Sequence, residues 1–176
     1  MRAWIVLVFL ALGSNLVLAE EPTLGPAIEG YGPTYPIDER DVPLDEDRTY
    51  SAVFDAAAYA DGPSAQSTRL VSVARFLNMH ARNGTALENM EVAVVVHGAA
   101  LKTLFNHEAY QRLFGIDNPN LELVTRLHDA GVRFYVCGQS MAFGGYPKSN
   151  LADPAQLALS AMTMLTVLQN DGYALL

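Results

Sequence analysis

The chain has 176 residues, 51% of them hydrophobic, and it carries 11 Lys and Arg against 19 Asp and Glu, a formal net charge of −8. This acidic balance argues against nucleic acid and anionic membrane surfaces as partners, because both bind basic surfaces. The length fits one domain with a sizeable core after a short leader.

Residues 1–19 have the pattern of a cleaved signal peptide. Arg2 supplies a positive start, and the apolar stretch Ala3–Leu12 is too short for a stable membrane span. Val17 and Ala19 place small or medium side chains before the expected cleavage site. We therefore predict export to the periplasm, with cleavage near Ala19 and no membrane attachment of the mature chain.

Residues 20–48 are rich in proline and acidic residues and have few consecutive apolar positions. A segment of this composition buries little surface by itself. Two interpretations stay open. The segment is either a loosely ordered spacer or an arm that lies across a neighbouring subunit through Ile28, Tyr31, Tyr35 and Ile37.

From Tyr50 onward the pattern alternates between strands and helices. Tyr50–Ala56 is predicted as a strand, and Gln66–Arg82 as a helix with apolar residues at intervals of three and four. Val92–Val96 is an unbroken apolar run, typical of a strand that is covered on both faces in a parallel sheet. We expect the next helix to begin within Ala99–Phe105.

The same alternation continues to the end of the chain. Asn118–Pro119 predicts a helix start, because a capping side chain precedes a proline whose missing N–H costs nothing there. Val132–Cys137 is predicted as a strand, periodicity predicts one helix over residues 153–170, and Tyr173–Leu176 would be a short last strand. Residues 49–176 are therefore predicted to form a doubly wound α/β domain with a parallel sheet.

Two side chains capable of chemistry follow predicted strands: His97 and Cys137. Ligands of open α/β sheets bind beyond the carboxyl ends of the strands, so both residues are candidates for catalysis. Residues 138–143 are predicted to start a short helix, and a thiol at a helix N-terminus is favoured as thiolate. We assign the residues beside them to the binding site: Gly98, Gly138, Gln139 and Ser140.

Each candidate has a structural alternative. A single free cysteine in an exported chain is either a small buried hydrophobe or a reactive group. His97 is expected either to bond to backbone at the strand end or to act beside Cys137. His80, His107 and His128 are expected on helix surfaces, and Asn78 on a surface or interface. The sequence has no metal-ligand spacing, so we expect neither a metal nor another cofactor.

Three segments together resemble the DsrE/DsrF-like family in its exported, single-chain branch: Val94–Ala100, Ala130–Met141 and Leu168–Tyr173. The resemblance implies a three-layer fold with a mostly parallel five-stranded sheet, helices on both faces, and homotrimers or hexamers. It also implies a short strand near Gln156–Leu159 before a helix from about Ser160, in place of the continuous helix that periodicity predicts. Cys137 occupies the place of the cysteine that holds sulfur as a persulfide in sulfur-relay members.

The resemblance therefore implies a sulfur carrier or sulfurtransferase-type protein that uses Cys137 as thiolate or persulfide, with a protein as sulfur donor or acceptor. Whether such a protein counts as an enzyme stays open. The alternative is a non-catalytic oligomer that binds a small ligand near His97, Cys137 and Tyr146, in which the cysteine is structural.

Overall fold

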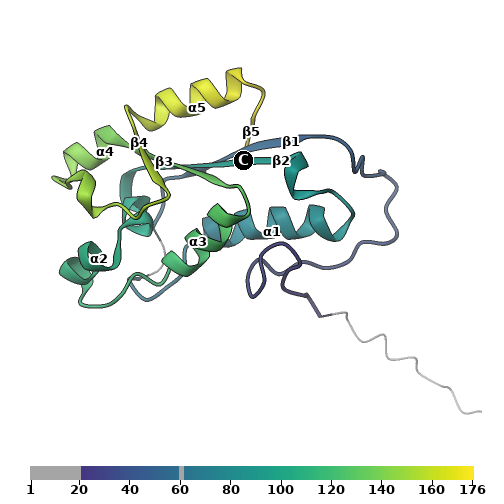
Figure 1. Cartoon of the computed structure of the whole chain (residues 1–176), viewed down its shortest axis with the longest axis horizontal. Helices are drawn as coiled ribbons and strands as arrows, with labels where there is room; N and C mark the ends of the chain where they lie inside the picture. Colours follow the sequence, from purple (N-terminus) through teal and green to yellow (C-terminus); the bar gives the residue numbers. More distant parts are fainter. Residues whose placement is uncertain (1–20, 60–61) are drawn as a thin grey trace, which may run out of the picture.

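The computed structural model describes residues 21–59 and 62–176, so the predicted signal peptide lies outside the described residues. A five-stranded sheet forms the middle layer, with α5 on one face and α1 and α3 on the other (Figure 1). The three-layer α/β architecture is thereby confirmed.

The sheet has the strand order β4-β3-β2-β1-β5, and every pairing is parallel. The sheet is therefore wholly rather than mostly parallel. Its strands are β1 (Tyr50–Ala56), β2 (Met90–Val96), β3 (Arg133–Cys137), β4 (Ala155–Ala158) and β5 (Ala174–Leu175). A strand at Ala155–Ala158 contradicts the continuous helix predicted from periodicity, because residues 155–158 pair with β3. The strand and helix implied by the resemblance are correct.

The helices are α1 (Thr68–Arg82), α2 (His107–Phe114), α3 (Leu121–Asp129), α4 (Gly138–Phe143) and α5 (Ala161–Asn170). Short 3-10 turns are η1 (Leu87–Asn89), η2 (Gly98–Leu104) and η3 (Lys148–Asn150). The helix expected from Ala99–Phe105 is thus a 3-10 turn, and α2 follows it as a separate helix.

The start of α3 also differs from the prediction. Its N-cap is Asn120, not Asn118, because the Asn118 side chain is used elsewhere. The Asn118 amide donates to the carbonyls of Lys102, Thr103 and Phe105, and its Oδ1 accepts from Asn120. Asn118 therefore joins the loop before α3 to η2.

The core has two parts, one on each face of the sheet. On the α1 and α3 face, side chains such as Val94, Val96 and Val136 pack with both helices. On the α5 face, a smaller group packs beneath that helix: Val53, Ala93, Val95, Cys137, Ala161, Leu168 and Tyr173. Alternation along each strand sends successive side chains to opposite faces. Cys137 therefore belongs to the α5 face.

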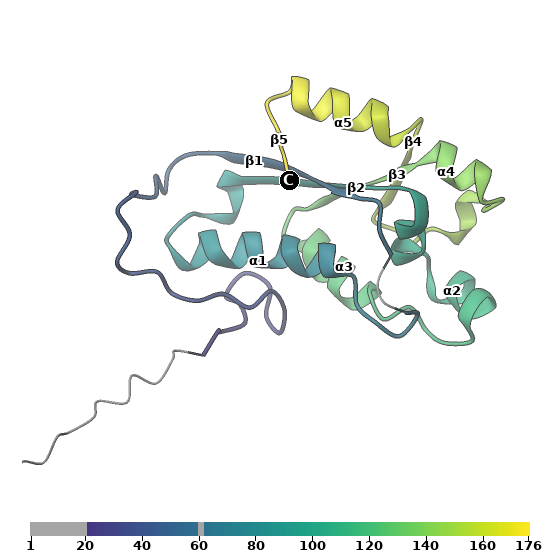
Figure 2. The same cartoon turned by 180° about the vertical axis from the view of Figure 1, so that it is seen from behind.

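The proline-rich segment packs against its own chain. Its beginning lies on the outer side of α1, away from the sheet, and its remainder runs past the end of α1 to reach β1 (Figure 2). Ile28 is 2% exposed and belongs to the main core. The fully buried Asn78 accepts from the Ile28 N–H at 2.7 Å and donates to the carbonyls of Tyr31 and Gly32. The loosely ordered spacer is therefore wrong for this part of the arm. Asn78 was expected on a surface or interface, and it lies buried between α1 and the arm.

The anchoring of the arm extends along α1. Arg82 donates to Thr34 Oγ1 and to the Gly25 carbonyl, and Arg75 donates to the Pro33 carbonyl. Tyr35 and Ile37, by contrast, are about half exposed.

In the described part of the chain, no helix is long and apolar enough to cross a membrane.

Candidate functional site

The sheet register brings the two predicted catalytic residues to one edge. Val96 of β2 pairs with Val136 of β3, and His97 and Cys137 are the next residue on each strand. Parallel neighbouring strands lie about 4.8 Å apart. The two strands are therefore neighbours, and both residues lie at the carboxyl edge of the sheet.

Cys137 is the N-cap residue of α4 and is 5% exposed. The Ser140 N–H donates to Sγ over 3.4 Å. Cys137 also pairs with Ala158 at the end of β4, and α5 begins three residues after that position at Ala161. The thiol therefore sits where the N-termini of α4 and α5 meet.

Opposing effects act on the pKa of the Cys137 thiol. Burial raises this pKa, since it disfavours the charged thiolate. Hydrogen bonds from the Ser140 hydroxyl, and from the backbone N–H groups of Ser140, Ala161 and Gln139, lower it. The hydrogen bonds outweigh burial, so the pKa of Cys137 lies below its usual value. The site therefore favours the thiolate more than the surroundings of an ordinary cysteine do.

Ser140 joins the ends of the two strands. Its Oγ accepts from the Gly98 N–H at 3.1 Å, which leaves its own proton to donate to Cys137 Sγ. The predicted site residues Gly98 and Ser140 thus meet through this hydrogen bond. Gln139 is exposed and contributes through its backbone N–H.

Gly138 has a steric role. A Cβ atom built at this position would lie 2.6 Å from the Ala158 carbonyl oxygen. Only glycine lets the backbone after Cys137 approach the end of β4 this closely. The close approach keeps the start of α5 beside the thiol.

His97 contacts a carboxylate that the sequence analysis did not assign. Its Nε2 lies 2.8 Å from Asp55 Oδ1 on β1, and both side chains are about one-third exposed. The ring therefore bonds to a side chain of β1 and not to the backbone, which was one of the two alternatives considered from the sequence. Asp55 lies two residues after Val53, which belongs to the α5-face core, so strand alternation was the signal that would have placed it there.

The residues after α4 divide between core and surface. Met141 is 3% exposed, and the Tyr146 ring packs on Phe105 with centroids 4.9 Å apart. Phe143 is 91% exposed. Of these apolar residues, Phe143 is therefore the one that remains free to meet another molecule.

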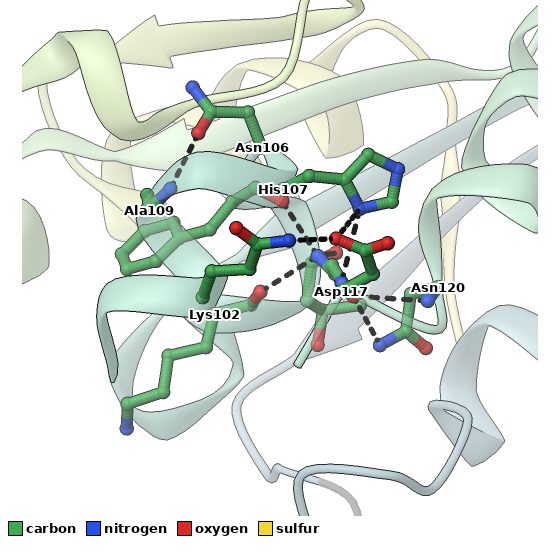
Figure 3. Close-up of polar contacts among 10 residues, drawn as sticks. Lys102, Asn106, His107, Ala109, Asp117 and Asn120 are labelled. Carbon is green, nitrogen blue, oxygen red and sulfur yellow. Dashed lines mark hydrogen bonds and ion pairs between the residues drawn. The ribbon is translucent and has the colours of Figure 1, made fainter. Parts of the chain in front are cut away.

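The other histidines lie away from Cys137. His80 is buried, contrary to prediction, with Nδ1 2.8 Å from the Phe76 carbonyl oxygen and its ring between Tyr50 and Phe76. His107 is exposed and lies beside Asp117, with 3.6 Å between Nδ1 and Oδ1 (Figure 3). His128 is exposed, as predicted.

Figure 3 also shows that His107 lies within a group of polar contacts around Asp117 and Asn120. The ring accepts from the Asn118 N–H at 3.2 Å, next to the Asn118 and Asn120 pair that ties η2 to α3. Within residues 21–59 and 62–176, no group of three or more His, Cys, Asp or Glu side chains is placed to hold a metal ion.

The comparisons with known proteins agree with this fold. A model of the DsrE/DsrF-like family matches residues 49–176, and the chain belongs to that family. The search of curated proteins found no match. Among solved structures, the chain is similar to MTH1491, a protein of unknown function from Methanobacterium thermoautotrophicum.

The similarity to that structure concerns the fold. The TM-score is 0.55 at 20% sequence identity, and the match covers 72% of this chain and 97% of the other. The family membership suggests a fold related to sulfur relay.

Proposed function

We propose that this protein carries sulfur on Cys137, as a sulfurtransferase-type protein that accepts and passes on a sulfane sulfur. The observation that carries the proposal is the surroundings of Sγ. The Ser140 hydroxyl and N–H groups from the starts of α4 and α5 stabilise a thiolate, and thiolate is the nucleophile in sulfur transfer.

The same hydrogen-bond donors can also stabilise a second sulfur atom bound to Cys137. When the thiolate attacks a persulfide donor R–S–SH, an Sγ–S bond forms and R–S⁻ leaves, so the sulfane sulfur moves without net oxidation. Hydrogen-bond donors that stabilise anionic sulfur at Sγ also serve a persulfide anion one bond further out. Family membership supports this proposal, since the family suggests a sulfur-relay fold.

Intact mass spectrometry of the purified mature protein tests this function. After exposure to polysulfide, the wild type should gain one sulfur atom that a reducing thiol removes. Cys137→Ser should gain none while keeping its circular dichroism spectrum and size in solution. A slow thiol without added sulfur would refute the proposal and favour a structural cysteine in a ligand-binding protein.

We also propose that the chain forms homo-oligomers through the surface beside Cys137. Phe143, Leu159 and Met162 are 91%, 71% and 77% exposed, and they come from α4, the β4–α5 turn and the first turn of α5. Apolar side chains this exposed are typical of protein contact sites. Light scattering should give a mass above the monomer for the wild type and a lower one for Met162→Glu.

The proposed setting is the periplasm. The apolar leader at residues 3–12 supports export, and the acidic net charge of −8 fits a chain that avoids anionic membrane surfaces. N-terminal sequencing of the protein recovered from periplasmic extract should read from Glu20. An intact Met1 in the mature protein would contradict cleavage.

A further inference from the structure

Three chemically capable side chains share one face and one edge of the sheet. Asp55 is two residues beyond Val53, and His97 is two residues beyond Val95; both valines lie in the α5-face core that also contains Cys137. Side chains two residues apart on a strand point to the same face. The carboxyl edge of the α5 face therefore presents a carboxylate on β1, an imidazole after β2 and a thiol after β3.

The backbone holds these positions tightly. The His97 N–H donates to the Ala56 carbonyl at 2.9 Å, which extends the pairing of β1 and β2 to His97. The next N–H, that of Gly98, donates to Ser140 Oγ on α4. His97 is thus tied to β1 on one side and to the helix that Cys137 caps on the other.

The contact with Asp55 determines which ring nitrogen of His97 bears the proton. An ionised carboxylate only accepts hydrogen bonds, so the Nε2 atom 2.8 Å from Asp55 Oδ1 bears the proton. In the neutral ring, Nδ1 is then the proton acceptor.

We propose that His97 is the proton acceptor and donor for sulfur transfer at Cys137, and that Asp55 is the positioning residue that sets its tautomer. This inference rests on the proposed sulfur-carrier function. His97 takes the proton of the Cys137 thiol as Sγ attacks the sulfane sulfur of R–S–SH. The donor S–S bond breaks, R–S⁻ leaves, and His97 H⁺ protonates it. The sum is Cys137–SH plus R–S–SH giving Cys137–S–SH plus R–SH.

The partial exposure of the pair suits this role. Both side chains are about one-third exposed at the strand end, so the pair can be reached from solution. Arg69, at the start of α1, is a further charged group near Asp55, and the two residues line a hollow of about 300 Å³. A pair that only joined β1 to β2 would affect stability and leave the chemistry of Cys137 unchanged.

The test compares His97→Gln and Asp55→Asn with the wild type and with His128→Gln, an exposed histidine on α3, as the matched control. Rapid-quench mass spectrometry follows sulfur loading from a small-molecule persulfide across pH 5 to 9. We expect His97→Gln to load roughly 100-fold more slowly near neutral pH, the size of general acid–base effects. Asp55→Asn should also load more slowly than the wild type, because an amide N–H can donate to Nε2 and would then favour the other tautomer of His97.

A second readout on the same variants is the pH profile of Cys137 alkylation by iodoacetamide. Loading profiles of both variants within two-fold of the wild type at every pH would overturn this inference and leave the sulfur-carrier function standing. A wild type that does not load would instead refute that function. The alkylation profile would then decide whether His97 is coupled to Cys137, since an unchanged profile in His97→Gln overturns the coupling. If His97→Gln fails to fold, the Asp55→Asn profile decides.

Discussion

The thiolate character of Cys137 depends most directly on Ser140, so Ser140→Ala is the sharpest perturbation of the site. Ser140 supplies both a hydroxyl and a backbone N–H to Sγ, and alanine removes the hydroxyl alone. The Gly98 N–H that Ser140 Oγ accepts belongs to an exposed residue and can bond to water instead. The variant therefore isolates one hydrogen bond to sulfur.

The magnitude follows from the strength of that bond. A hydrogen bond to a charged group contributes about 1.5–3 kcal/mol. One pKa unit corresponds to about 1.36 kcal/mol, so the loss raises the pKa of Cys137 by about one to two units. Cys137 is 5% exposed, and burial raises its pKa. In the variant, fewer hydrogen bonds oppose this effect of burial.

The assay is the second-order rate of iodoacetamide alkylation from pH 5 to 10. The wild-type midpoint should lie below that of an unstructured cysteine peptide measured in parallel. The Ser140→Ala midpoint should lie one to two units higher, Ser140→Thr should restore it, and exposed Ser149→Ala should leave it unchanged. Equal midpoints in the wild type and Ser140→Ala would refute the assignment of the hydroxyl as a donor to Sγ.

Three further results are expected. Asn78→Ala should lower the free energy of unfolding by roughly 3 kcal/mol in urea titrations, because it leaves buried backbone groups of the arm without hydrogen-bond partners. A loss under about 1 kcal/mol would contradict the conclusion that Asn78 anchors the arm to α1. Gly138→Ala should lower stability and raise the Cys137 alkylation midpoint, because its Cβ would displace the end of β4; a wild-type melting temperature and midpoint would disprove this. The lowered pKa of Cys137 should stabilise the wild type relative to Cys137→Ala at pH above the unfolded thiol pKa, and this advantage should disappear as pH falls through the folded pKa; a pH-independent difference in urea midpoints would contradict it.

The strands and helices were predictable where the local hydrophobic pattern alone determines the structure. The strand Tyr50–Ala56 matches its predicted bounds, and the run ending at Val96 is a buried central strand. Prediction failed where side chains or backbone groups bond to residues distant in the sequence. Asn118 looked like a helix cap but bonds to η2 carbonyls, and residues 155–158 continued a helical pattern but pair with β3.

In the candidate site, too, some features follow from the local sequence and others from contacts between distant residues. Position after a strand was enough to select His97 and Cys137, because parallel strands end at one edge. Asp55 was missed because its role depends on the order of β1 and β2 in the sheet, which local sequence does not encode. The approach of the Ala161 N–H to Sγ likewise requires β4 to lie beside β3.

The sequence by itself determined the fold class, the family and the identity of the thiol, since these depend on periodicity, buried strand runs and a local Cys-centred motif. Tertiary structure alone decided that the arm packs on its own α1, that Asp55 pairs with His97, and that two helix starts converge on Cys137. The reason is physical. Each of these features joins residues distant in the chain, and their geometry exists only once the order and register of the strands are set.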